Sequence, residues 1–331
     1  MDIPIRHRRL RINESVRSLI RENHLSTKDF ILPIFINEGV NNKEAIPSMP
    51  GIYRLSLDLL KEEIKLIWQL GIRAVNIYVK VDQSLKDNTG KEAWNPDGLM
   101  QRAIKTVKEI APEMVVMPDV ALDPYSMFGH DGIVKNGTVL NDETVEALVK
   151  MSISHAESGA DFVAPSDMMD GRVAAIRQGL DQNGFTKVGI MSYAAKYASN
   201  FYGPFRDALD SAPVDNQEIP RDKKTYQMDY HNSMEALREA EADVIEGADI
   251  LMVKPGMAYL DIVRLVKDHL QVPVSVYQVS GEYAMIKAAS EKGWLDHDQV
   301  MLESLTAFKR AGADLISTYF AKEAAVLLNN E

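Results

Sequence analysis

Short apolar segments alternate with amphipathic segments along most of the chain. The apolar segments are rich in Val, Ile and Met at successive positions, which is typical of parallel strands that helices cover on both faces. We predict eight such strands, at Phe30–Asn37, Ala74–Val81, Met114–Asp123, Phe162–Pro165, Val188–Tyr193, Ile250–Lys254, Val274–Val279 and Leu315–Tyr319. Amphipathic segments of helical length lie between them, for example Leu57–Leu70, Leu99–Ile110, Asp142–Glu157, Ser233–Glu246 and Leu260–His269.

The tripeptide Gly-Ala-Asp occurs three times, each time between a predicted helix and a predicted strand. Its copies begin at Gly159, Gly247 and Gly312. A glycine here ends a helix with a left-handed cap, and a short loop then turns directly into the strand. Repeated short loops of one kind favour an α/β fold of the (β/α)8 TIM-barrel type over a doubly wound sheet. The lack of a Gly-rich phosphate-binding loop after the first strand also weakens the dinucleotide-binding alternative.

The two ends of the chain differ in character. Residues 1–28 are polar and basic with little periodicity, so we expect an extended N-terminal oligomerisation arm there and one catalytic barrel over residues 29–331. The basic cluster within Arg6–Arg11 suits either nucleic acid or another protein surface, and the net charge of −11 favours the protein surface. Two irregular segments, Ser126–Leu140 and Ala212–Gln227, follow strands and are therefore expected to cover the C-terminal face as lids.

Composition limits the classes of function. Of 331 residues, 46% are hydrophobic and 26% are charged, which indicates a folded globular chain. No apolar segment approaches the roughly 18 residues that span a membrane, and the first residues carry no apolar signal segment. We therefore expect a soluble, cytoplasmic protein with no membrane or nucleic-acid partner. The absence of cysteine excludes disulfides, thiolate nucleophiles and zinc held by thiolates.

Two lysines stand at the ends of neighbouring predicted strands. Lys196 follows the apolar segment that begins at Ile190, and Lys254 ends the next strand just before Pro255. A buried lysine is explained either by an ion pair with a carboxylate or by chemistry. Two ammonium groups on adjacent strands repel each other, so each loses its proton more easily, and a neutral amine can form a Schiff base. One such lysine suggests an aldolase, and two suggest an enzyme that joins two carbonyl compounds.

Carboxylates lie towards the end of the third predicted strand. Asp119 and Asp123 have the same parity along that strand and should project from one face, with His130 and Asp131 in a glycine-rich loop above them. Oxygen ligands of this kind suit an ammonium group, Mg²⁺ or a monovalent ion better than zinc. Alternatively, Asp123 only caps a turn at Pro124.

Other polar residues lie at the ends of later strands. Arg206 and the pair Lys223-Lys224 are candidates for holding a substrate carboxylate, although lysines on a loop are commonly solvated. Ser280 and Tyr319 both end barrel strands, and the alternative for Tyr319 is a place in the core.

Several segments closely resemble the porphobilinogen synthase family, also called 5-aminolevulinate dehydratase. The resemblance extends from Arg8 to Tyr319, and the two lysine motifs are its most specific part. The segments that carry it are Asp119–Gly132, Ser192–Ser199 with Tyr202–Arg206, and Met252–Met257.

The resemblance implies a reaction and a site. It implies condensation of two 5-aminolevulinate molecules to porphobilinogen, with loss of two waters, in the biosynthesis of haem and chlorophyll. Lys254 would form the Schiff base with the substrate that becomes the propionate side, and Lys196 would hold the acetate-side substrate. Asp119 would orient an amino group. The further substrate-binding positions that it implies are Arg206, Lys223, Ser280, Tyr319, Ser166, Asp123 and Asp131.

The resemblance also bears on metals and assembly. Zinc-dependent members have three cysteines where this chain has Ala121, Asp123 and Asp131, so we expect no zinc and a magnesium-responsive enzyme. An allosteric Mg²⁺ would bind Glu239 directly and Asp167 through water, the plain alternative being an exposed glutamate on a helix. A further Mg²⁺ or monovalent ion in the active site and a homo-octamer joined through N-terminal arms are also implied. A one-lysine aldolase and a non-catalytic binding barrel are the rival interpretations.

Overall fold

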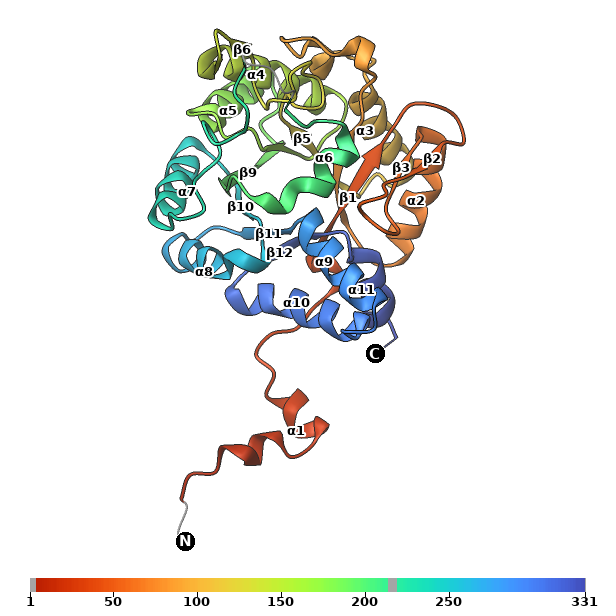
Figure 1. Ribbon diagram of the computed structural model, residues 1–331, viewed down its shortest axis with the longest axis vertical. Helices are drawn as coiled ribbons and strands as arrows, with labels where there is room; N and C mark the ends of the chain where they lie inside the picture. The colour runs from red at the N-terminus through yellow and green to blue at the C-terminus, as the bar shows by residue number, and fades with distance from the viewer. Residues whose placement is uncertain (1–3, 214–218, 331) are drawn as a thin grey trace.

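The computed structural model describes residues 4–213 and 219–330. Within these residues eight parallel strands close into a barrel, which confirms the predicted TIM barrel (Figure 1). The strands follow the chain around the barrel in order, and the last pairs with the first through Phe30 and Ile316. The barrel strands are β1 (Phe30–Ile36), β4 (Ala74–Val79), β5 (Val115–Val120), β8 (Phe162–Pro165), β9 (Gly189–Lys196), β10 (Ile250–Lys254), β11 (Val274–Gln278) and β12 (Leu315–Thr318).

Helices surround the barrel because each presents one apolar face to the strands. In α2, for example, Leu60, Ile64 and Ile67 follow helical spacing and all are fully buried. The outer helices are α2 (Leu57–Gln69), α3 (Leu99–Ile110), α4 (Asn141–Glu157), α5 (Arg172–Gln182), α7 (Met234–Glu246), α8 (Leu260–His269), α10 (His297–Ala311) and α11 (Ala321–Leu328).

Further helices and short strands lie between the barrel elements, mostly in the loops that follow barrel strands. They are η1 (His7–Arg11), α1 (Glu14–Leu19), η2 (Thr27–Asp29), β2 (Lys43–Ala45), β3 (Tyr53–Leu55), η3 (Gln83–Leu85), η4 (Lys91–Trp94), β6 (Val134–Lys135), β7 (Thr138–Val139), η5 (Asn200–Tyr202), α6 (Gly203–Leu209), η6 (Met257–Tyr259) and α9 (Ser280–Glu291).

The three Gly-Ala-Asp loops have one structure. Each glycine has a φ between +103° and +109°, the left-handed cap that the sequence predicts. The aspartate that follows accepts a hydrogen bond of 2.8 Å from a backbone N–H near the start of a neighbouring strand. These bonds join Asp161 to Val116, Asp249 to Ile190 and Asp314 to Val274. The repeated motif therefore fixes strand starts at three places around the barrel.

Two predicted strand ends are wrong by three residues, and the other strand ends differ by two residues or fewer. β5 ends at Val120 and not at Asp123, because residues 122–126 form a turn in which the N–H groups of Tyr125 and Ser126 bond to the carbonyl of Leu122. β9 is longer than predicted and includes Lys196. Lys196 is thus held by a strand, whereas Asp123 is held by a loop.

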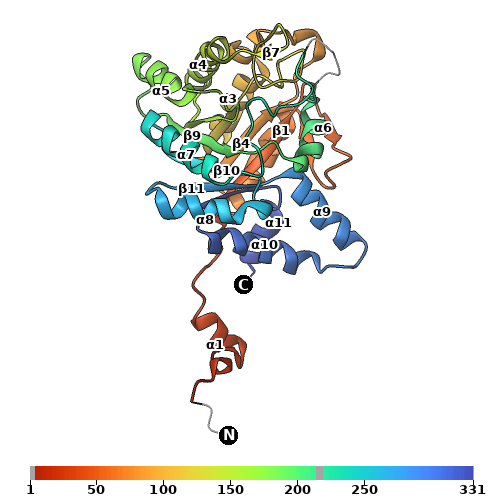
Figure 2. The same cartoon turned by 60° about the vertical axis from the view of Figure 1, so that its left-hand side comes forward.

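The N-terminal segment lies apart from the barrel. Figures 1 and 2 show η1 and α1 extending beyond the strand ends where the chain enters the barrel. Apolar side chains of this segment are exposed, Leu19 by 84% and Ile12 by 70%. Of the helices in the described ranges, none is long and apolar enough to cross a membrane.

Candidate active site

The two lysines of the sequence prediction lie opposite each other on adjacent strands. In the β9–β10 ladder Lys196 is the register partner of Lys254. Farther back, Leu251 pairs with Ser192 and Val253 with Ala195, so β9 contains one more residue than β10 over this stretch. This bulge brings the two lysines level. Both side chains are buried at the C-terminal end of the barrel, where enzymes of this fold have their sites.

Lys254 lies in a setting without a close counter-charge. Among the residues of the described ranges, none forms an ion pair with its ammonium group, and aromatic rings surround it. Burial, together with the nearby charge of Lys196, lowers the pKa of Lys254 from 10.5 to about 7. Near neutral pH a large share of this amine is therefore unprotonated and able to attack a carbonyl carbon.

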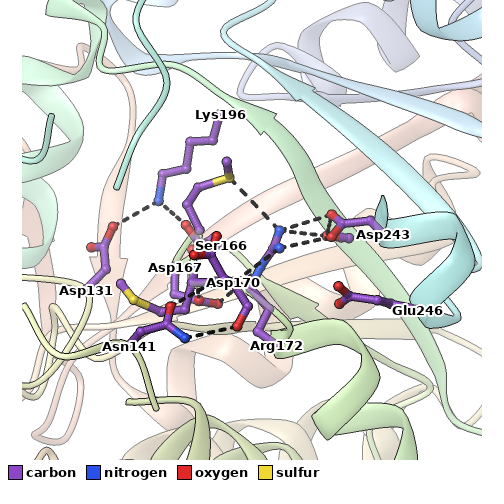
Figure 3. Close-up of polar contacts among 12 residues, drawn as sticks. Asp131, Asn141, Ser166, Asp167, Asp170, Arg172, Lys196, Asp243 and Glu246 are labelled. Carbon is purple, nitrogen blue, oxygen red and sulfur yellow. Dashed lines mark hydrogen bonds and ion pairs between the residues drawn. The ribbon is translucent and has the colours of Figure 1, made fainter. Parts of the chain in front are cut away.

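Lys196 lies in a polar setting. Its Nζ donates to the backbone carbonyl of Ser166 and lies 3.3 Å from Oδ2 of Asp131 (Figure 3). Burial by itself would raise the pKa of Asp131, but the ammonium groups of Lys196 and Lys223 outweigh it and hold that pKa well below the ordinary value. Lys196 is thus paired with a carboxylate, which Lys254 is not.

Asp119 in β5 and Asp123 in the loop that follows lie close together, although Asp123 is not part of the strand. Burial and the adjacent charge of Asp123 raise the pKa of Asp119 to about 7. One oxygen of Asp119 has no hydrogen-bond partner in the described part of the chain. A carboxyl group in this state can take up or release a proton near neutral pH.

The predicted carboxylate binders divide into two groups. Arg206 and Lys223 belong to the first group. They line one small cavity of about 20 Å³, whose lining also includes Asp123, Lys196 and Lys254. Lys223 contacts Asp131 at 2.6 Å and Asp123 at 3.4 Å, so its ammonium group is the cation that lies between these carboxylates.

The second group lies outside this cavity's lining. Ser280 begins α9, and its Oγ accepts a 3.0 Å hydrogen bond from the N–H of Phe205. Tyr319 follows β12, and its hydroxyl lies 2.9 Å from that of Tyr277. Both side chains are buried.

Residues 219–228 bring polar groups that sequence reasoning missed. Tyr226 lies 3.1 Å from Nδ1 of His130 and accepts from the N–H of Asp131, while Gln227 donates to the Asp131 carboxylate. Nε2 of His130 lies 2.8 Å from the carbonyl of Pro220. No local pattern marks Tyr226 or Gln227, because their partners are about 95 residues away along the chain.

The expected metal residues occupy different environments. Glu239 lies on α7 and lines an outer cavity of about 340 Å³ together with Asp170 and Glu235. Burial and the acidic neighbours Asp243, Asp170 and Glu235 raise the pKa of Glu239, although Arg172 partly opposes them. A cation in this cavity would relieve that repulsion.

Asp167 is not among the residues that line this cavity. It is fully buried, and one of its oxygens has no hydrogen-bond partner in the described ranges. Burial raises its pKa to about 6 in spite of Arg172, whose Nε lies 3.8 Å away. Across residues 4–213 and 219–330 no three His, Asp or Glu side chains converge on a ready-made metal site.

Arg172 ties this region together, as Figure 3 shows. Its guanidinium group binds both oxygens of Asp243, at 3.0 and 3.1 Å, and the hydroxyl of Ser192 at 3.0 Å. These contacts join α5, α7 and β9, so they brace the strand that carries Lys196. The sequence motif around Asp170 did not predict this buried ion pair.

Comparison with known proteins agrees with this geometry. The sequence profile described as delta-aminolevulinic acid dehydratase matches residues 4–327. The delta-aminolevulinic acid dehydratase of Bradyrhizobium diazoefficiens is 54% identical over 331 residues, which are all of this chain and 93% of that protein. The chloroplastic enzyme of Chlamydomonas reinhardtii is also 54% identical and covers 100% of this chain and 86% of its own length.

This chain belongs to the delta-aminolevulinic acid dehydratase family. A crystal structure of the family member from Toxoplasma gondii, also called porphobilinogen synthase, was solved in complex with the product porphobilinogen. It superimposes with a TM-score of 0.96 at 50% identity, over 99% of this chain and 93% of that one. The family resemblance seen in the lysine motifs is thereby confirmed over the whole barrel.

Proposed function

We propose that this protein condenses two molecules of 5-aminolevulinate into porphobilinogen, with loss of two waters, through Schiff bases on Lys254 and Lys196. Family membership supports the reaction. The observation that carries the assignment to these residues is the register pair of two buried lysines in β9 and β10. A one-lysine aldolase would not need the second amine at this position.

Each lysine traps one ketone. The unprotonated amine of Lys254 attacks the ketone carbon of one substrate, and loss of water leaves an iminium group that serves as an electron sink. Lys196 binds the second substrate in the same way after its ammonium group, which is paired with Asp131, releases a proton to solvent. Asp119, with its raised pKa, is positioned to exchange protons with a substrate amino group. Formation of one carbon–carbon and one carbon–nitrogen bond then closes the ring.

Substrate carboxylates need cationic or hydroxyl partners. Arg206, Lys223, Ser280 and Tyr319 are the candidates for this role, as the family resemblance implies. A 20 Å³ cavity has room for about one water, so substrate binding requires Lys223 to exchange its aspartates for a substrate carboxylate and to move. Asp123 and Asp131 are then free to hold a substrate ammonium group, Mg²⁺ or a monovalent ion.

An allosteric Mg²⁺ fits the outer cavity. Mg²⁺ commonly binds through one or two carboxylates and keeps several waters, which suits a site with Glu239 as its direct ligand. Asp167 stays in the proposal as a ligand through water, and Asp170, which lines the cavity, is a second candidate for such a contact. When bound, the ion would supply charge neutralisation there and no chemistry at the lysines. Zinc is not expected, since no cysteine is present.

The exposed arm supports an assembly. Apolar side chains such as Leu19 and Ile12 have no cover in one chain, so we include in the proposal a homo-octamer in which arms dock on neighbouring copies. A role in haem or chlorophyll biosynthesis and a cytoplasmic location complete the proposal. The cysteine-free composition requires no oxidising compartment.

Borohydride trapping tests the central claim. Reduction in the presence of 5-aminolevulinate should attach substrate covalently to the peptides that contain Lys254 and Lys196, as peptide mass spectrometry would show. Purified enzyme should also release porphobilinogen from 5-aminolevulinate alone. Labelling of Lys254 only, with turnover of a sugar phosphate, would replace the proposal with an aldolase.

A further inference from the structure

Four aromatic rings surround the ammonium group of Lys254. Its Nζ lies 4.6 Å from the ring centroid of Tyr277, 4.8 Å from Phe205, 5.1 Å from Tyr193 and 5.4 Å from Tyr202. These distances are within the range in which a cation is attracted to the negative face of a ring. The rings come from β11, α6, β9 and η5, so four separate segments converge on one nitrogen.

Hydroxyl pairs fix two of these rings. The hydroxyl of Tyr193 lies 2.8 Å from that of Tyr78, and the hydroxyl of Tyr277 lies 2.9 Å from that of Tyr319. Each ring therefore uses its hydroxyl elsewhere and turns its face to Lys254. Burial raises the pKa of Tyr193 and Tyr277 well above 10, so both rings stay neutral at physiological pH.

The two lysines thus differ in what faces their positive charge. Lys196 has the Asp131 carboxylate at 3.3 Å, whereas Lys254 has ring faces. A carboxylate in contact favours the protonated form of an amine, so such an amine has to lose that proton before it attacks a carbonyl carbon. A ring face attracts a cation more weakly, so it leaves room for the amine to lose its proton and still favours the positive charge that returns when the iminium forms.

We propose that Tyr277, Tyr193, Tyr202 and Phe205 form an aromatic cage that stabilises the cationic iminium on Lys254 in place of a carboxylate. The inference rests on the proposed function, because it requires Lys254 to carry the Schiff base. The bond changes are those of imine formation: the nitrogen–carbon bond forms, the carbonyl oxygen leaves as water with one hydrogen from the amine and one proton from solvent, and the nitrogen keeps one hydrogen and carries the positive charge. The cage takes no proton and supplies only the negative ring faces.

The test compares ring removal with ring retention at one position. Tyr277→Phe keeps the face that Lys254 contacts, and Tyr277→Leu removes it. Levulinate, a keto acid without the amino group, is the probe, and borohydride trapping at Lys254 is followed across pH. The leucine variant should trap about two- to thirtyfold less than wild type at neutral pH, the range for one desolvated ring. The phenylalanine variant should stay within about threefold of wild type.

The pH dependence separates the cage from a merely structural role. Loss of a ring that favours the cation should move the trapping midpoint of the leucine variant to lower pH, while Tyr277→Phe should leave it in place. The charged groups that act on Lys254 are Lys196 from β9, Asp119 from β5, and Asp123 and Asp131 from the following loop, and all remain in both variants.

A series of fluorinated variants tests the cage even if the leucine variant misfolds. Phenylalanine with increasing fluorination at position 277 keeps the shape of the ring and weakens its negative face. Trapping should fall steadily with each fluorine, and a flat series would overturn the cage. If wild-type Lys254 is not labelled at all, the proposed function fails first. If wild-type Lys254 is labelled, but neither the leucine variant nor the fluorinated variants change the extent or the pH midpoint of labelling, the cage is contradicted and the proposed function is not.

Discussion

Lys196 and Lys254 stand opposite each other on adjacent strands, yet their surroundings differ in kind. Lys196 contacts a carboxylate and a backbone carbonyl, while Lys254 faces tyrosine and phenylalanine rings. Both are buried to a similar degree, so burial alone does not distinguish them. Strand register thus brings the amines of Lys196 and Lys254 together, while the residues that face each amine influence how readily it loses its proton. A nearby counter-charge stabilises a buried ammonium group, and without a counter-charge burial favours loss of the proton.

Removal of the Lys254 amine should have the largest effect on turnover. Lys254→Met should lower turnover by about 10⁴-fold or more, the scale of effect seen when a catalytic nucleophile is removed, as measured by porphobilinogen release. Lys292→Met is the matched control, because Lys292 also lies over an aromatic ring but on the surface. The control should keep wild-type turnover. Near-normal turnover in Lys254→Met would remove the Schiff-base role.

The next largest effect is expected from removing the charge of Asp131, which pairs with both Lys196 and Lys223. Asp131→Asn leaves Lys196 and Lys223 buried beside a neutral side chain, so the free energy of unfolding at pH 7 should fall by about 3–5 kcal/mol. Urea unfolding measures this change. The depressed pKa of Asp131 means that its stabilisation is complete above the unfolded value of about 3.9 and is lost as pH falls through the folded value. The gap between variant and wild type should therefore close in acid.

The pH profile sharpens the contrast between the amines. With a pKa of about 7, Lys254 should be labelled by levulinate and borohydride progressively better as pH rises through 7, since only the unprotonated amine attacks. Lys196→Met removes the neighbouring positive charge, so the labelling midpoint of Lys254 should rise by about one pH unit. A midpoint that does not move would mean that burial alone sets this pKa.

Magnesium should have the smallest effect. Removal of metal with a chelator, followed by Mg²⁺, should restore about fivefold in activity, the lower end of typical allosteric coupling. Glu239→Gln should abolish that response, while Glu241→Gln, an exposed position on the same helix, should keep it. Zn²⁺ and K⁺ added singly show whether another ion acts at Asp123 and Asp131. An undiminished Mg²⁺ response in Glu239→Gln would place the ion elsewhere.

The barrel and the lysine pair could be predicted from the sequence because both depend on local patterns. Apolar strands and the Gly-Ala-Asp loops mark the repeating units, and Lys254 ends its strand at Pro255. The predicted strand through Asp123 failed because the turn at Pro124 competes with strand extension. This turn is set by hydrogen bonds within residues 122–126, and the spacing of apolar residues carries no information about such bonds.

Contacts between distant segments were beyond sequence reasoning. Arg172 and Asp243 are 71 positions apart. In the sequence, each has the pattern of an ordinary charged residue on a helix, so their ion pair is not predicted. The aromatic residues of the cage lie on four segments, and nothing in the sequence shows that their faces meet at one nitrogen. Physical packing brings these groups together, and only coordinates reveal it. The roles of the substrate and metal residues stay predictions for the experiments above.

The extra residue in β9 restricts how this enzyme can change over evolutionary time. Side chains alternate between the two faces of a strand, so deleting that one residue, or adding one to β10, would point one lysine at the surrounding helices. Substitutions along these strands can accumulate one at a time, but a length change in either strand alone would remove an amine from the site in a single event. Homologues that retain the two-amine chemistry should therefore show insertions and deletions in the loops around these strands and none between Ser192 and Lys196.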